Sequence, residues 1–314
     1  MAGSHATAAL CDLIWIRAWS DDCVMLDLKR GQRRRPFTGS KMSFKTVLVH
    51  AEPGPACDRR VRLALRIADL FDACVIGLGA EAFGPMIASD YATADGAVIE
   101  AVRERIAADL PAAEKHFREL TCGREGVAWV AGEDYPDKML ALCARGADLI
   151  VAGRPARGES TTFAAKPTDL VMEAGGPILL EADSNHEFIG ERVIVAWKDS
   201  RESRRALADA LPFLMRAQDV VIVAVCGDAD VRTDQSGMHE VVRRLARHGV
   251  TASVEVAPKG KESVAQALED AANRHCADLI VSGAYGHSRF REWTLGGVTE
   301  DLIASCSKHL LLSH

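Results

Sequence analysis

The segment with the clearest chemical signature lies near the C-terminus, in VSGAYGHSRFREWTLGGVTEDL, residues 281–302. Gly283, Gly286 and Gly296 follow the spacing G-x2-G-x9-G there, directly after the apolar run ADLIV. Glycines after a strand allow the backbone to approach a ligand and to turn its N–H groups toward it. The sequence GVTEDLIASC predicts a helix at the far end of the segment, and a helix N-terminus adds free N–H groups and partial positive charge. The pattern favours a site for phosphate.

Further candidate residues flank these glycines or follow another predicted strand, RVIVAW. The carboxyl ends of parallel strands share one edge of a sheet, where ligands bind at the point of strand-order reversal. Such polar residues are more often solvated loop charges, and glycines after a strand are often only turn residues. The candidate set besides the three glycines is Ala196, Trp197, Lys198, Asp199, Ser200, His287, Arg289, Gly297, Val298 and Thr299.

The elements that must position these residues follow an alternating pattern. Short runs rich in Val, Ile and Leu, such as KTVLVHA and ACVIGLG, are separated by longer stretches with apolar residues at helical spacing. Near-continuous apolar strands indicate a parallel sheet covered by helices on both faces. In the helix predicted at CDRRVRLALRIADLF we expect Val61, Leu65, Ala68 and Leu70 on the buried face. The residues expected to face water are Arg59, Arg60, Arg62, Arg66 and Asp69.

The five-strand pattern occurs twice, which indicates an internal duplication. ADLIVAGRPARG at 147–158 aligns with ADLIVSGAYGHS at 277–288. We therefore expect one domain over residues 42–184 and a second over residues 190–314, separated by a polar stretch. Residues 1–41 lack this periodicity and carry seven Lys/Arg against four Asp/Glu, so we expect a disordered or non-native extension.

Composition narrows the class of protein. A content of 48% hydrophobic and 26% charged residues in 314 residues is typical of a soluble globular chain. The net charge of −6 argues against a general nucleic-acid partner, and no run of apolar residues is long enough to span a membrane. Nine cysteines without CxxC pairs are interpreted as buried, reduced thiols of a cytoplasmic protein, with no metal site.

The glycine spacing, together with the duplicated five-strand pattern over about 270 residues, resembles the universal stress protein family in its tandem form. The resemblance implies two Rossmann-like or flavodoxin-like domains, each a five-stranded parallel sheet in the order 3-2-1-4-5. It further implies a cleft for ATP or AMP, with Mg²⁺ accompanying ATP, in members that keep the full motif. Family domains pair through their last strands, so the resemblance implies an intramolecular pseudo-dimer with PILLEA beside HLLLSH and allows a further homodimer.

The chain departs from the family pattern at two positions of the second repeat. Gly297 stands where the family has Ser or Thr, which removes one hydroxyl donor to phosphate. Lys198 stands where the family has an Asp, and Asp199 comes one residue later. A lysine can bind phosphate instead, but the carboxylate that would contact ribose or adenine is missing at this position.

The first repeat has lost more of the motif. It keeps Gly153, but Ala156 replaces the second glycine, and Ala164 and Ala165 replace the pair Gly296 and Gly297. An alanine is strained wherever the glycine used a positive φ. We therefore predict no nucleotide in the first domain.

The sequence gives less support to a catalytic function. Lys198-Asp199-Ser200 is similar to the end of the phosphate loop of ATP pyrophosphatases, but both glycines that would wrap pyrophosphate are absent. Asp199 as a phosphoacceptor lacks the acidic cluster that a receiver domain requires. The favoured prediction is a cytoplasmic, nucleotide-binding stress-response regulator or protective module rather than an enzyme. A scaffold of the same fold without nucleotide is the main alternative, and weak ATP hydrolysis is a further one.

Overall fold

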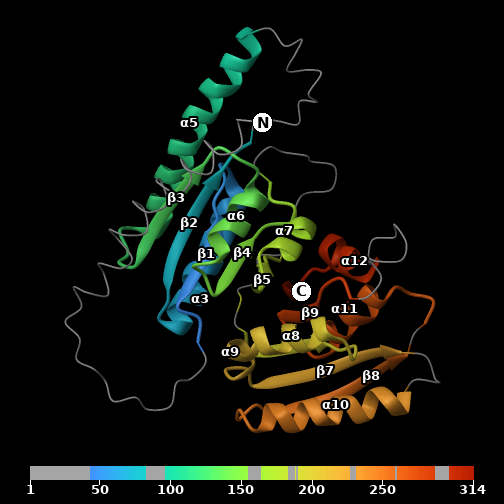
Figure 1. Ribbon diagram of the computed structural model, residues 1–314. Helices are drawn as coiled ribbons and strands as arrows, with labels where there is room; N and C mark the ends of the chain where they lie inside the picture. Colours follow the sequence, from blue (N-terminus) through green and yellow to red (C-terminus); the bar gives the residue numbers. More distant parts are fainter. Residues whose placement is uncertain are drawn as a thin grey trace, which may run out of the picture.

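The computed structural model describes residues 43–82, 96–154, 164–182, 188, 190–226, 231–258, 260–286 and 297–314. The predicted extension, residues 1–41, lies outside them. Two α/β repeats make up the described chain (Figure 1). The first repeat contains β1 (Thr46–His50), α3 (Pro55–Phe71), β2 (Cys74–Ala80), α5 (Gly96–Thr121), β3 (Val127–Gly132), α6 (Pro136–Ala144), β4 (Leu149–Ala152), α7 (Pro167–Glu173) and β5 (Ile178–Leu180).

The second repeat has the same order of strands and helices, with one short extra helix. It contains β6 (Arg192–Ala196), α8 (Arg201–Asp209), α9 (Leu211–Leu214), β7 (Asp219–Cys226), α10 (Val231–Ala246), β8 (Ala252–Pro258), α11 (Val264–Arg274), β9 (Leu279–Gly283), α12 (Gly297–Ser305) and β10 (His309–Ser313).

All ten strands form one sheet in the order β3-β2-β1-β4-β5-β10-β9-β6-β7-β8. Each repeat therefore has the predicted order 3-2-1-4-5, with parallel neighbours throughout, and the predicted fold class is confirmed. The last strands of the two repeats pair antiparallel, with Leu179 opposite Leu311. The expected pairing of PILLEA with HLLLSH is thus present within the chain.

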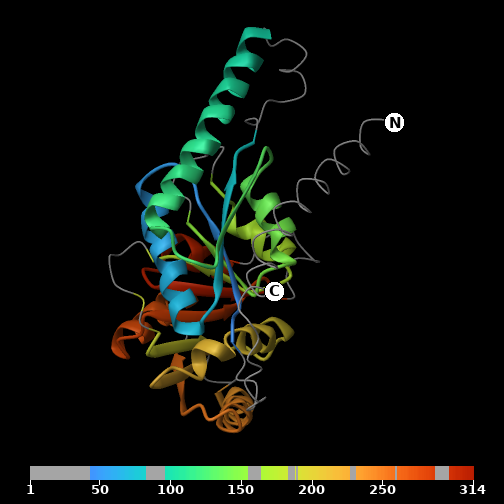
Figure 2. The same ribbon diagram turned by 90° about the vertical axis from the view of Figure 1, so that its left-hand side faces the viewer.

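Helices cover both faces of the sheet, which explains why the strands are apolar without alternation. Side chains of α3, α5, α8, α9 and α10 pack with one face, and those of α6, α7, α11 and α12 pack with the other. The 26-residue helix α5 projects beyond the end of the sheet (Figure 2). None of the helices in the described ranges combines the length and the hydrophobicity needed to cross a membrane.

The prediction for the buried face of α3 was partly wrong. The helix buries Cys57, Val61, Ala64, Ala68 and Phe71, which are three or four residues apart, whereas Leu65 and Leu70 are only half-buried. Arg60, expected to face water, is 2% exposed. Its guanidinium is buried because partners surround it, as shown below.

The cysteines also depart from expectation. All seven in the described part of the chain are free thiols, but Cys122 and Cys276 are exposed and Cys74 is half-buried. Only the remaining four, Cys57, Cys143, Cys226 and Cys306, are buried as predicted.

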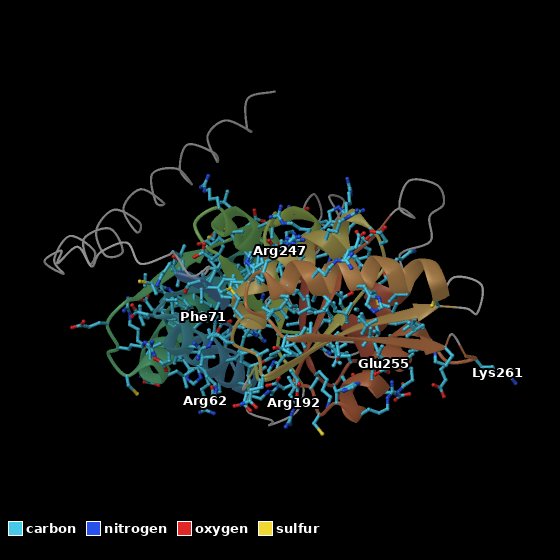
Figure 3. The ribbon with its side chains drawn as sticks, turned by 90° about the horizontal axis from the view of Figure 1, so that it is seen from below. Arg62, Phe71, Arg192, Arg247, Glu255 and Lys261 are labelled. Atoms are coloured by element: carbon cyan, nitrogen blue, oxygen red, sulfur yellow. The ribbon has the colours of Figure 1, made fainter. Side chains whose placement is uncertain are left out.

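An aromatic cluster joins the two repeats beside the β5–β10 pair. The ring of Phe213 from α9 lies 5.0 Å from that of Phe44 and 5.4 Å from that of Phe71, both in the first repeat. Phe188, between the repeats, packs on Phe213 and on His309. Figure 3 labels Phe71 on α3, beside the second repeat. The cluster fixes the two repeats through buried surface in addition to the strand pair.

We expect Phe213→Ala to lower the free energy of unfolding by about 3–5 kcal/mol, because a large buried ring is replaced by a cavity between the repeats. Urea denaturation followed by circular dichroism measures the change. Val298→Ala, at a side chain 41% exposed, is the control and should change stability by less than about 0.5 kcal/mol. A loss below about 1 kcal/mol for Phe213→Ala would show that the cluster does not hold the repeats together.

Candidate functional site

The two predicted strand ends of the second repeat lie side by side. β6 and β9 are parallel neighbours with Ala196 opposite Ser282, so the residues after Ala196 and Gly283 share one edge of the sheet. Trp197 is buried in the core, whereas Lys198 is exposed and forms no ion pair with any residue in the described ranges. The carboxylate of Asp199 points to Arg204, with 3.4 Å between oxygen and nitrogen.

Ser200 explains why α8 begins where it does. Its hydroxyl oxygen accepts a hydrogen bond from the backbone N–H of Ser203, at 3.3 Å, which is the geometry of a helix N-cap. The cap brings the first turn of α8, with Glu202, over the end of β9. Ser200 therefore has a structural task whether or not a ligand is present.

Gly283 is required by this packing. A Cβ atom at Gly283 would lie 2.5 Å from the carbonyl carbon of Glu202 and 2.5 Å from the nitrogen of Ser203, both backbone atoms of α8. No side chain fits there unless the helix moves. The glycine predicted to approach a ligand thus approaches a helix, and it holds α8 tight against β9.

Gly286 lies near the same turn of α8. A Cβ at Gly286 would be 3.3 Å from Oε2 of Glu202 and 4.0 Å from the hydroxyl of Ser200. Gly286 itself is exposed. The second glycine of the motif therefore does border the candidate site, next to a carboxylate.

The helix N-terminus predicted to face a ligand begins at Gly297. Gly297 and Val298 are exposed, whereas Thr299 is buried and its hydroxyl oxygen accepts a hydrogen bond from the backbone N–H of Tyr285, at 3.2 Å. Tyr285 has a φ of +54°, which turns the chain directly after β9. This hydrogen bond ties the start of the loop to the start of α12. The predicted residues His287, Arg289 and Gly296 lie outside the described residues.

Glu202 is a site residue that sequence reasoning missed. Its side chain is 2% exposed, and one carboxylate oxygen, Oε1, accepts from Nε of Arg201. Burial alone would raise the pKa of this carboxyl, but hydrogen bonding to Arg201, to its own backbone N–H and to Ser200 lowers the pKa below its usual value. The group is an anion at neutral pH. The signal that could have revealed it is an acid in the first turn of a capped helix, directly after the strand predicted to lie at the site.

The corresponding place in the first repeat is filled by protein. A Cβ at Gly153 would lie 2.1 Å from a guanidinium nitrogen of Arg60, so that side chain occupies the space beside the glycine. Arg60 donates to the backbone oxygen of His50 at 3.1 Å, to Glu52 at 3.1 Å and to Glu181 at 3.3 Å. These partners come from the carboxyl ends of β1 and β5 and explain why a buried arginine is tolerated. Ala156 lies outside the described residues, and Ala165 is buried.

His50 in this cluster is an acceptor. Arg60 lies 3.3 Å from its Nδ1, and since a guanidinium can only donate, Nδ1 carries no proton. Burial lowers the pKa of His50 to about 4, against the opposing effect of Glu52 and with the help of Arg60. The ring is therefore neutral at physiological pH.

Comparison with known proteins agrees with this architecture. Residues 190–314 match the model of the universal stress protein family. A universal stress protein from Archaeoglobus fulgidus superposes with a TM-score of 0.63 at 15% identity, covering 85% of this chain and 95% of that one. A functionally unknown protein from Pseudomonas aeruginosa gives a TM-score of 0.52 at 15% identity, covering 86% and 92%. No curated protein sequence matches the chain.

Identities this low show the fold alone, whereas the family match rests on the sequence of the second repeat. Residues 190–314 thus match the universal stress protein family in sequence, and the first repeat carries the same strand order on the same sheet.

We expect Gly283→Ala to destabilise the protein by about 1–3 kcal/mol, because the added methyl group would force α8 away from β9. The matched control is Gly297→Ala, since a Cβ there meets nothing within 4 Å and Gly297 begins a helix. That variant should be neutral or slightly stabilising. Thermal unfolding of both variants compares them, and equal stability would contradict the close approach at Gly283.

The buried His50 predicts a pH dependence of stability. Its folded pKa lies below the unfolded value of 6.5, so the unfolded chain takes up the proton first. The stabilisation is complete above pH 6.5 and is lost as pH falls toward 4, by about 3 kcal/mol in total. Urea unfolding at pH 7.5, 6 and 5 should show a shallower fall for His50→Gln than for the unmodified chain. Parallel curves for the two proteins would contradict a neutral, buried His50.

Proposed function

We propose that the chain is a nucleotide-responsive regulator or protective module of the stress response, and that ATP or AMP binds at the carboxyl edge of β6 and β9. The match of residues 190–314 to the universal stress protein family supports the stress-response role. The observation that supports a nucleotide there is that Lys198 and the N-terminus of α12 both lie at the carboxyl edge of the strands of the second repeat. Both are positive and exposed, and the start of α12 is tied through Thr299 to Tyr285, next to Gly286.

In this proposal the phosphates lie toward the backbone N–H groups of Gly297, Val298 and Thr299 and toward Lys198. Helix N-termini favour anions through free donors and the helix dipole. The Thr299 hydroxyl oxygen accepts from the backbone N–H of Tyr285, which leaves its own O–H proton available to donate. Ala196, Trp197, Asp199 and Ser200 form the floor of the site, and His287, Arg289 and Gly296 stay predictions. Mg²⁺ would accompany ATP as its counter-ion and offset the charge of Glu202.

The first repeat takes no nucleotide in this proposal. The guanidinium of Arg60 occupies the space beside Gly153, and a ligand would have to displace it from two carboxylates. Removing the arginine would leave Glu52 and Glu181 unpaired, with Glu181 buried, which is strongly unfavourable. One nucleotide per chain is therefore expected.

A scaffold without nucleotide is the second candidate, and one observation favours it. The packing of α8 on β9 accounts for Gly283 without any ligand. In that case Gly283 would be needed only for the packing of α8 on β9, and the second repeat would serve to bind the first.

Isothermal titration calorimetry of the full chain with ATP, ADP and AMP separates the two candidates. We expect one site per chain, and we expect Lys198→Ala to weaken ATP binding about threefold to tenfold, as for an exposed charge pair. Lys115→Ala, at an exposed lysine on α5 in the first repeat, is the control and should leave affinity unchanged. No heat of binding at millimolar nucleotide would reject the nucleotide proposal in favour of the scaffold.

A further inference from the structure

One arginine of the first repeat reaches across to the last helix of the second. Arg154, two residues after the end of β4, donates from Nη1 to the backbone oxygen of Cys306 and from Nη2 to that of Lys308, the latter at 2.6 Å. Cys306 directly follows α12, and Lys308 directly precedes β10. These two hydrogen bonds form the Arg154 clasp, in which one planar guanidinium holds the whole turn between α12 and β10.

The clasp lies where a helix has a use for positive charge. The last carbonyl oxygens of a helix have no donor within it and carry partial negative charge, so a cation there stabilises the helix. At the other end of α12, the hydroxyl of Thr299 accepts from the backbone N–H of Tyr285. Because α12 has only nine residues, contacts at both ends fix the position of its N-terminus.

The backbone that carries Arg154 is itself held by the buried cluster of the first repeat. Its neighbour Gly153 lies against the guanidinium of Arg60, which is paired with Glu52 and Glu181. Moving this stretch of backbone would disturb a buried ion-pair network, which is strongly unfavourable. The cluster that fills the carboxyl edge of the first repeat therefore also gives Arg154 a rigid base.

The two repeats contact each other unequally. In the alignment of ADLIVAGR with ADLIVSGA, Ala284 takes the place of Arg154 and offers no side-chain donor. The second repeat instead reaches the first through Arg205 of α8, whose Nη2 donates to the oxygen of Gly175, at 3.0 Å, in the turn between α7 and β5. Each repeat thus holds the turn before the last strand of the other. Only Arg154 acts on the helix whose N-terminus borders the proposed nucleotide site.

We infer that Arg154 is a positioning residue through which the first repeat sets the nucleotide affinity of the second. The inference rests on the proposed function and concerns the regulation of that same site. With the clasp in place, the N–H groups at the start of α12 are fixed before the ligand arrives, so less ordering has to accompany binding. Linkage requires the reverse effect as well, so a nucleotide bound at α12 strengthens the hold of Arg154 on the second repeat.

Calorimetric titration of the full chain with ATP compares Arg154→Gln with Arg205→Gln. Both variants lose a contact between the repeats, and both should lower the thermal midpoint of unfolding by a comparable amount. Only Arg154→Gln should weaken ATP binding, by about threefold to tenfold, with one site per chain retained. Arg154→Lys keeps the charge but cannot bond both carbonyls with a rigid fork, so its affinity should be intermediate.

Hydrogen–deuterium exchange of the nucleotide-free proteins gives a readout that does not depend on ATP. Exchange at residues 297–308 should be faster in Arg154→Gln than in the unmodified chain, because the end of α12 has lost its donor. Arg205→Gln is the control and should leave exchange in this segment unchanged. Unchanged exchange in Arg154→Gln would show that the clasp does not position α12 and would overturn the inference.

The outcomes separate this inference from the proposed function. Unchanged ATP affinity in Arg154→Gln, while the unmodified chain binds ATP, would overturn the role of Arg154 and leave the proposed function intact. Equal weakening by Arg154→Gln and Arg205→Gln would also overturn it, because affinity would then follow the docking of the repeats in general. If Arg154→Gln does not fold, Arg154→Lys makes the same comparison, and full affinity in that variant would contradict the bond to two carbonyls. No binding of ATP by the unmodified chain would overturn the proposed function and the inference together.

Discussion

The antiparallel pairing of β5 with β10 is the constraint on which the rest of the molecule depends. A five-stranded parallel sheet of either repeat would end in an unpaired last strand, and an exposed edge of Leu and Ile residues invites aggregation. Joining the two last strands removes both edges at once. Because the pair is antiparallel while all other neighbours are parallel, the carboxyl ends of the two repeats lie on opposite edges of the ten-stranded sheet. The two equivalent places are therefore separate sites.

Because the two sites are separate, the same backbone arrangement can carry different side chains beside Gly153 in the first repeat and beside Gly283 in the second. In each repeat a helix after the first strand presses against the glycine that follows the fourth strand, and in each a charged side chain of that helix is buried there. Arg60 in the first repeat is enclosed by its own carboxylates, so the place serves stability. The carboxylate of Glu202 in the second repeat accepts from Arg201 and lies beside the exposed Gly286.

The sequence was sufficient for the architecture and for the position of the two glycines at the end of β9. Unbroken apolar runs predicted buried parallel strands, which are present because the sheet is covered on both faces. The duplication predicted two five-stranded units of the same strand order, and the two are joined in one ten-stranded sheet. The spacing of Gly283 and Gly286 located the edge of β9 correctly. It could not show that Gly283 serves a helix, because a close approach by protein and one by ligand select the same residue.

The burial of two charged side chains could not be predicted from sequence patterns, for a related reason. Arg60 was assigned to the solvent because an isolated arginine in a helix is nearly always exposed. Its partners Glu52 and Glu181 are 8 and 121 residues away, so the sequence alone does not show that they meet. Glu202 escaped notice in the same way, since its neighbour Gly286 lies on a distant strand end and only the fold brings them together.

Native mass spectrometry of the full chain with excess ATP and Mg²⁺ tests the central claim most directly, because it counts nucleotides per chain. The account predicts a single bound nucleotide, with the second repeat occupied and the first closed by Arg60. Two bound nucleotides would contradict the closure of the first repeat, and none would contradict the nucleotide site itself.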